Sequence, residues 1–161
     1  MKYYTQEWCF SNLDDQEIEE RQKNYFEYID KIYEKLPFTL KLLAKKINLH
    51  DGIISSIAFH HEQNILILKG VFGDLQTGYF LLEIKYLKTK NLSKELLISI
   101  FNEKKLEVLS DEFEFFSLGS YSHRILFSSK QEIEILFGDM EVCINNTTAE
   151  SYKKEYCRVE L

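Results

Sequence analysis

The sequence predicts an α+β fold, in which N-terminal helices pack on a mainly antiparallel sheet of about five or six strands. The first observation is a helical periodicity of apolar residues that is confined to residues 12–47. The second is an alternating periodicity that extends over residues 52–145. Because the helices come first and the strands then follow one another, this order favours α+β over a wound sheet of alternating strands and helices.

We expect one domain over residues 1–161, because this length suits a single core. The chain has one proline and six glycines, so a Pro- or Gly-rich linker between two domains is not expected. Residues 146–161 show mixed periodicity and receive no structural assignment.

The charge and the cysteines restrict the partners and the compartment. The net charge of −6 argues against nucleic acid and anionic membrane surfaces, since both bind clustered lysine and arginine, but it permits a basic protein partner. The three cysteines form no CxxC pair, and the N-terminal segment lacks the apolar region of a signal peptide. No stretch approaches about 18 continuous apolar residues, so we expect a cytoplasmic protein without a membrane span.

Two helices are predicted before the first strand. In the first helix, apolar residues recur at spacings of three, four and seven, which places them in one stripe on one face. Pro37 ends this helix, and a second, shorter helix covers residues 38–47. The stripe consists of Ile18, Tyr25, Phe26, Ile29, Ile32, Tyr33 and Leu36.

The strand-rich part contains six predicted strands and one further helix. The last strand shows a slip in its apolar phase between Phe137 and Met140, which predicts a β-bulge at residues 138–139. The predicted strands cover residues 52–59, 64–72, 79–86, 105–116, 122–128 and 132–144, with the helix over residues 91–104.

Two histidine-containing pairs stand where predicted strands begin. His50 and Asp51 precede the first strand, and His123 and Arg124 begin a later one. If these strands were parallel neighbours, the two pairs would form a shared polar site, whereas in an antiparallel pair they would lie at opposite ends. The alternative is structural, since Asp51-Gly52 is also ordinary turn chemistry.

Motifs of known catalytic and metal sites are absent from the sequence. It contains no HExxH, HxH, paired cysteine, GxSxG, P-loop or GxGxxG pattern. His60, His61 and Glu62 are adjacent, but neighbouring side chains of an extended chain diverge, so we predict a polar hairpin loop. The paired carboxylates at residues 14–15, 19–20 and 111–112 are predicted to be solvated charge. No catalytic residue, metal ligand or cofactor is therefore predicted.

The acidic first helix is the feature that best suits partner binding. Eight acidic residues lie between Asp14 and Glu34, against three basic ones. Such a face steers a basic protein towards it. The alternative is a solvated face that is balanced by the lysines of the next helix. The predicted partner-binding residues are Asp14, Asp15, Glu17, Glu19 and Glu20.

Four segments, in their order along the chain, resemble a family of uncharacterised bacterial cytoplasmic proteins described as a domain of unknown function. Its members open with a M-K/R-Y-Y/F-T-x-E-W segment. The resemblance extends from Met1 to Val142 and implies a bacterial origin, an intracellular location, one α+β domain and no assigned catalytic residue. Ser110 departs from the family, which often carries an aromatic residue there. The segments are "MKYYTQEW" (1–8), "LHDGIISSI" (49–57), "VLSDEFE" (108–114) and "SHRILFSSKQEIEILFGDMEV" (122–142).

Two functions follow as hypotheses. The strand–hairpin ending is also similar to that of immunity proteins, which neutralise toxins by direct binding, although such a likeness transfers no residue. The first hypothesis is therefore a non-enzymatic protein-binding module of an immunity-like kind. The alternative is a small metal-dependent or small-molecule-binding enzyme that uses His50, Asp51 and His123, with Glu62 as a further candidate.

Overall fold

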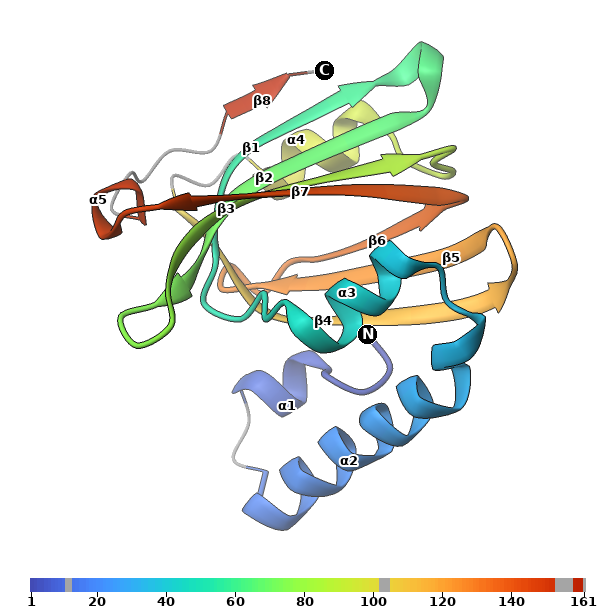
Figure 1. The fold of residues 1–161 in the computed structure, drawn as a ribbon, viewed down its shortest axis with the longest axis vertical. Coiled ribbons are helices and arrows are strands. Elements are labelled where there is room, and N and C mark those ends of the chain that lie inside the picture. Colours follow the sequence, from blue (N-terminus) through green and yellow to red (C-terminus); the bar gives the residue numbers. More distant parts are fainter. Residues whose placement is uncertain (11–12, 102–104, 153–157, 161) are drawn as a thin grey trace.

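The computed structural model describes residues 1–10, 13–101, 105–152 and 158–160. Its helices pack on a mainly antiparallel sheet, which confirms the predicted α+β class (Figure 1). The helices are α1 (Gln6–Phe10), α2 (Asp15–Ile32), α3 (Phe38–Lys46), α4 (Lys94–Phe101) and α5 (Ala149–Tyr152), with 3₁₀ turns η1 at Tyr33–Lys35 and η2 at His61–Gln63. The strands are β1 (Ile53–His60), β2 (Ile65–Asp74), β3 (Gly78–Leu87), β4 (Leu106–Ser117), β5 (Ser120–Phe127), β6 (Glu132–Phe137), β7 (Asp139–Thr147) and β8 (Arg158–Glu160).

The predicted number of strands, five or six, is too low. The described residues form eight, because the last predicted strand is two strands and because Arg158–Glu160 adds another from the unassigned tail. The end of the predicted helix over 91–104 lies at residues 102–104, outside the described residues. None of the described helices has both the length and the apolar character needed to cross a bilayer.

Gly138 is the point at which the chain changes from one strand partner to another. β6 pairs with β5, whereas β7 pairs with β3, so the two outermost strands in the order β6-β5-β4-β1-β2-β3-β7 are consecutive in the sequence. The Gly138 N–H donates to the Leu87 carbonyl at 2.9 Å and holds this junction to the end of β3. The predicted bulge at 138–139 is therefore wrong, since Phe137 and Met140 belong to different strands.

The sheet divides at β1. Only Ile53 and Ile54 pair with β4, whereas Ser56, Ile57 and Ala58 pair with β8. Beyond its first two residues, β4 consequently has β5 on one edge and no strand on the other among the described residues. The backbone groups of this second edge need hydrogen-bond partners of another kind, because an unpaired buried N–H is costly.

The inner face of the curved sheet and the helices enclose the core. Buried rings from distant strands meet there, with Tyr86 and Tyr121 lying 5.3 and 5.5 Å from Phe137 between ring centroids. α3 contributes Leu40 and α4 contributes Phe101, both fully buried. Full burial of one such side chain stabilises the fold by about 1.5–3 kcal/mol.

α2 packs through part of the predicted stripe. Tyr25, Ile29 and Ile32 are buried, whereas Phe26 is 54% exposed. Asp14 is the N-cap of the helix, and its carboxylate accepts the Glu17 N–H at 2.9 Å. Figure 1 shows the helix outside β4, below the sheet.

Tyrosine hydroxyls of α2 cover the edge of β4. The Phe113 N–H donates to the Tyr25 hydroxyl at 2.8 Å, and the Phe115 N–H donates to the Tyr28 hydroxyl at 2.9 Å. Tyr25 and Tyr28 are three residues apart on the helix and therefore share a face. The helix thus takes the place of a neighbouring strand over this part of β4.

We predict that Tyr25→Phe lowers the free energy of unfolding by about 1–3 kcal/mol, because the buried Phe113 N–H loses its acceptor. Tyr28→Phe should cost less, since its contact with Phe115 is only partly buried and water can replace the hydroxyl. Urea denaturation followed by circular dichroism measures both. Wild-type stability in Tyr25→Phe would show that the hydroxyl does not hold this edge.

Candidate functional site

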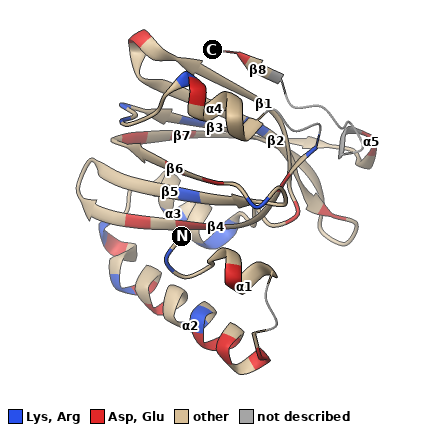
Figure 2. Ribbon diagram, turned by 180° about the vertical axis from the view of Figure 1, so that it is seen from behind, with Lys and Arg blue, Asp and Glu red and all other residues tan. Residues whose placement is uncertain are grey.

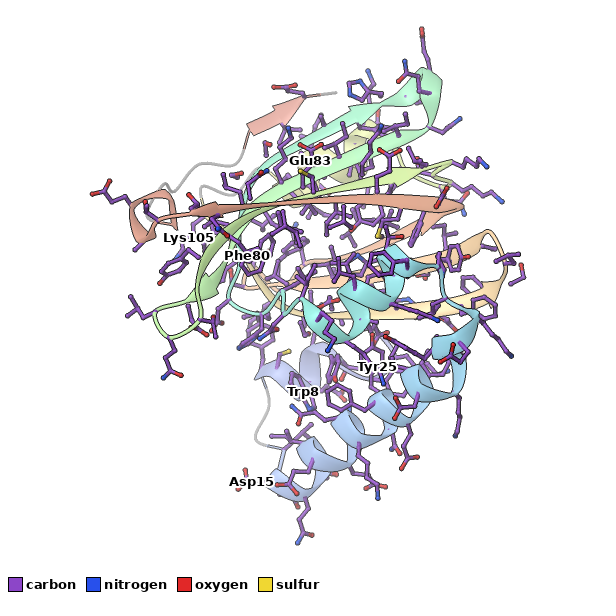
Figure 3. All side chains as sticks on the ribbon, in the orientation of Figure 1. Trp8, Asp15, Tyr25, Phe80, Glu83 and Lys105 are labelled. Atoms are coloured by element: carbon purple, nitrogen blue, oxygen red, sulfur yellow. The ribbon has the colours of Figure 1, made fainter. Side chains whose placement is uncertain are left out.

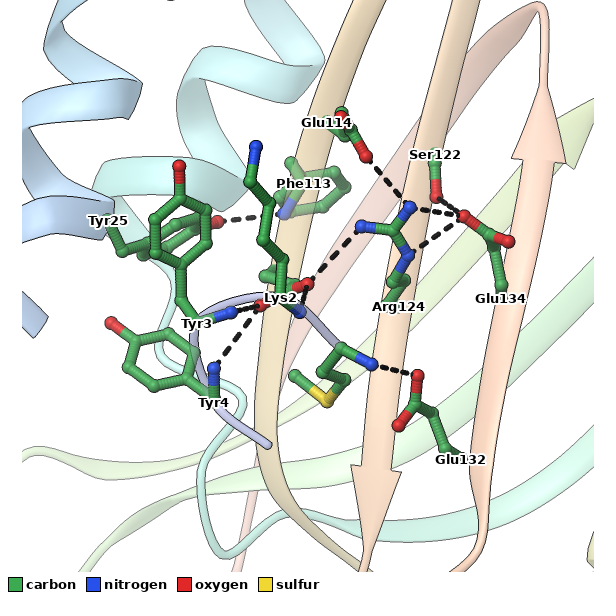
Figure 4. A network of polar contacts seen from close by, with 12 residues as sticks. Lys2, Tyr3, Tyr4, Tyr25, Phe113, Glu114, Ser122, Arg124, Glu132 and Glu134 are labelled. Atoms are coloured by element: carbon green, nitrogen blue, oxygen red, sulfur yellow. Dashed lines mark hydrogen bonds and ion pairs between the residues drawn. The ribbon is translucent and has the colours of Figure 1, made fainter. Parts of the chain in front are cut away.

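Arg124 of β5 joins three carboxylates on the outer face of β4, β5 and β6 (Figure 4). Its guanidinium donates to Glu112 at 3.3 Å, to Glu114 at 2.8 Å and to Glu134 at 2.8 Å. Burial alone lowers the pKa of Arg124, but the hydrogen bonds and charges of Glu114 and Glu134 outweigh it and raise the pKa above its ordinary value. The guanidinium is therefore a permanent cation with its donors engaged.

Glu112 is the buried centre of this network, at 1% exposure. Its carboxylate accepts the backbone N–H groups of Lys2, Tyr3 and Tyr4 in addition to the Arg124 donor, as Figure 4 shows. A buried carboxylate is stable as an anion when it has this many donors. The prediction of solvated charge at residues 111–112 is thus wrong for Glu112, because the N-terminal segment covers it.

His123 faces the opposite way from Arg124, into the core, and is fully buried. Its Nδ1 lies 2.7 Å from the Tyr86 hydroxyl and its Nε2 lies 3.1 Å from Oδ2 of Asp111. The ring stacks on Phe113 with centroids 4.0 Å apart. Burial, with the charge of Asp111 added, raises the pKa of Tyr86, so the hydroxyl keeps its proton.

His50 and Asp51 lie in the turn before β1. Their Nε2 and Oδ1 atoms are 3.2 Å apart, and both side chains are exposed. His50 also contacts the Leu109 carbonyl through Nδ1, and the Asp51 N–H donates to the Val108 carbonyl at 2.8 Å. This pair therefore fastens the turn to the first part of β4.

The structure does not bring the two histidine pairs together. β4 lies between β1 and β5, so His50 and His123 approach it from opposite sides, through Leu109 and Asp111 respectively. Glu62 lies in η2, the turn between β1 and β2. Among the described residues, no group of three or more His, Cys, Asp and Glu side chains is arranged to hold a metal ion.

A cleft of about 700 Å³ separates α1, α2 and α3 from the beginning of β4, and this volume is within the range of ligand sites. Figure 3 shows Trp8 and Tyr25 beside it, whereas Asp15 lies at the far end of α2. Sequence reasoning missed this site, because its walls come from separate segments that share no spacing. Its lining consists of Tyr4, Trp8, Gln22, Tyr25, Phe26, Asp30, Leu43, Ala44, Lys45, Lys46, Ile47, Asn48, His50, Leu109, Ser110 and Asp111.

Carboxylates lie close to the tyrosines that line the cleft. Burial raises the pKa of the Tyr4 hydroxyl, and the charges of Asp111 and Glu112 raise it further. The same carboxylates add to the effect of burial on the pKa of Tyr25. Lys45 and Lys46 also line the cleft, and the Lys45 ammonium pairs with Asp30.

The five acidic residues predicted to bind a partner are exposed on the N-terminal half of α2, where Figure 2 shows acidic residues gathered. Lysines of α3 pair with acids farther along the chain: Lys45 with Asp30 of α2, and Lys41 with Glu34 of η1 at 3.1 Å. Within the described residues, no ion pair includes an acid from the sequence Asp14–Glu20. The negative charge of this half is therefore available to a partner.

Comparison with known proteins assigns no family and no activity. No protein-family model, curated protein or solved structure matches the chain. The resemblance to the uncharacterised bacterial family thus stays a prediction from the sequence segments.

We predict that the stability contributed by the buried tyrosines is fully present below about pH 10 and is lost as the pH rises further. Tyr4, Tyr25 and Tyr86 have pKa values above their ordinary 10.0, because they are buried and lie near Asp111. The unfolded chain therefore loses protons that the folded protein keeps, and the free energy of unfolding falls with pH.

Urea unfolding between about pH 9 and about pH 11, combined with phenolate absorbance, measures this effect. Tyr25→Phe serves as the control and should show a shallower decline, since it removes one of these groups. Ionisation of all ten tyrosines within the folded protein would contradict the prediction.

Proposed function

We propose that this chain is a non-enzymatic module that binds a basic protein partner through a surface we term the acidic face. The acidic face consists of Asp14, Asp15, Glu17, Glu19 and Glu20. The observation that carries the proposal is that no ion pair among the described residues includes these five acids, whereas Asp30 in the C-terminal half of α2 pairs with Lys45 of α3. A helix whose acidic side chains served only as a solvated surface would not need this difference in ion pairing between its two halves.

The acidic face is continuous with the cleft along α2. Asp15, Glu19, Gln22 and Phe26 follow one another at spacings of four, three and four, so they share one side of the helix. Gln22 and Phe26 line the cleft. A partner that is attracted by the acids would thus meet the cleft and the exposed Phe26 ring in the same approach.

Charge of this kind contributes mainly to the rate and selectivity of association. A negative patch accelerates encounter with a positively charged surface, and dissolved salt weakens the attraction. The net charge of −6 adds to it at long range. Binding through the acidic face should therefore weaken as the salt concentration rises.

The contacts of His50, His123 and Cys9 do not favour catalysis. The ring nitrogens of His50 and His123 all lie at hydrogen-bonding or ion-pairing distance from protein atoms, so ligation of a metal would require them to leave these partners. Burial raises the pKa of the Cys9 thiol, although its contact with Ser110 acts the other way, and a protonated thiol is a poor nucleophile. These contacts suit a structural role.

The specific form we propose is an immunity-like protein that acts in the bacterial cytoplasm and neutralises a basic protein by covering part of its surface. The support for this form is the sequence resemblance and the similarity of the strand–hairpin ending. Immunity of this kind requires only a stable complementary surface, which the acidic face and the cleft supply.

We predict that Glu19→Lys combined with Glu20→Lys weakens capture of a basic protein from the source-cell lysate by at least ~10-fold, because charge reversal turns attraction into repulsion. Glu62→Lys combined with Glu141→Lys is the matched control, since it changes the net charge equally at exposed positions outside the acidic face. Capture at low and high salt, followed by mass spectrometry, gives the measurement. Equal capture by both double variants would refute the acidic face as the binding surface.

A further inference from the structure

The cleft is lined by aromatic rings and by the carboxylate of Asp111. The Tyr4 ring lies 4.9 Å from Trp8 and 5.2 Å from Tyr25 between centroids, and the half-exposed Phe26 ring stands at the mouth. Aromatic faces attract cations, most strongly where water is partly excluded. The walls of the cleft are therefore suited to a cationic group.

Asp111 has fewer hydrogen-bond partners than Glu112, the neighbouring carboxylate on β4. Glu112 is saturated by backbone donors and Arg124, and Asp30 pairs with Lys45. Asp111 is engaged through Oδ2 alone by His123, within the described residues, and its side chain is 21% exposed. A carboxylate accepts up to about four hydrogen bonds, so Asp111 retains acceptor capacity towards the cleft.

We infer that the cleft receives an arginine side chain of the basic partner, whose guanidinium stacks against the aromatic walls and donates to Asp111. That the arginine belongs to a basic partner rests on the proposed function. A planar guanidinium matches the site better than an ammonium, since it can lie flat on aromatic rings and donate two parallel hydrogen bonds to one carboxylate. Asp15 and Glu19 lie on the same side of α2 as the cleft residues Gln22 and Phe26, and they attract the same charge.

Trp8 provides the measurement, because it is the single tryptophan of the chain and lines the cleft. Its fluorescence is followed while a blocked tripeptide with a central arginine is added at constant ionic strength. The same tripeptide with lysine or with citrulline, the neutral analogue of arginine, provides the comparison. We expect a saturable change with arginine, and binding at least ~10-fold weaker with citrulline, because charge-assisted hydrogen bonds are the strong ones.

Two variants locate the site. Asp111→Asn should weaken binding of the arginine peptide by at least ~10-fold, because it removes the charge of the acceptor while retaining an oxygen for His123. Phe26→Ala should weaken binding about threefold, because it removes one exposed ring at the mouth. Phe38→Ala, which removes a ring that is 79% exposed and outside the cleft, should leave binding unchanged. If Asp111→Asn does not fold, Phe26→Ala against Phe38→Ala still decides the question.

The outcomes separate this inference from the proposed function. Equal binding of the citrulline peptide, or wild-type affinity in Phe26→Ala and Asp111→Asn, would overturn the cleft as a cation site. Equal affinity for lysine and arginine would overturn the assignment to arginine. If the arginine peptide binds but capture of a basic protein does not depend on Glu19 and Glu20, the proposed function fails and the arginine site stands.

Discussion

β4 leaves β1 after two paired residues, and the backbone groups on the edge it then exposes must find partners that are not a strand. Tyr25 and Tyr28 satisfy two of its N–H groups, and His50 reaches a carbonyl on the same strand. Since an unsatisfied buried backbone group costs free energy comparable to a lost hydrogen bond, this edge determines where α2 can lie. The position of the helix in turn creates the cleft that α1, α2 and α3 form with β4.

β4 carries one carboxylate that stabilises the fold and another that can still accept hydrogen bonds from a ligand. On the outer face, Glu112 and Arg124 are enclosed by donors and acceptors and hold the N-terminal segment against β4. On the inner face, Asp111 contacts the buried His123 and still lines the cleft. Because strand side chains alternate between faces, neighbouring carboxylates on β4 have different roles. The proposed binding function uses carboxylates whose hydrogen-bonding capacity is not filled by contacts within the fold.

Much of the architecture was accessible from local patterns. The stripe through Tyr25, Ile29 and Ile32 identified α2 and its buried face, because a helix that packs on one side leaves a period that sequence alone displays. Phe26 belongs to the same stripe but is 54% exposed, because it lines the cleft instead of packing in the core. Alternation likewise located the strands.

The features that escaped prediction depend on contacts between distant segments. Glu112 is buried because residues 2–4 fold over it, and its local sequence resembles any solvated acidic pair. Gly138 reads as a bulge, since periodicity shows a slip in phase but not a change of partner strand. His50 stands just before β1 as predicted, but His123 lies within β5 rather than at its start, and only the sheet order shows that β4 stands between them. Local sequence patterns indicate whether a segment is a helix or a strand. Which segments become its neighbours is decided by the topology of the sheet.

The central claim is that side chains of α2 close the edge of β4. Native-state hydrogen exchange of the Phe113 amide, resolved by NMR, tests it most directly. A hydrogen bond to the buried Tyr25 hydroxyl predicts that this amide exchanges only through global unfolding, as slowly as amides in the paired centre of β2 and β3. Exchange at the rate of an open strand edge would contradict the account.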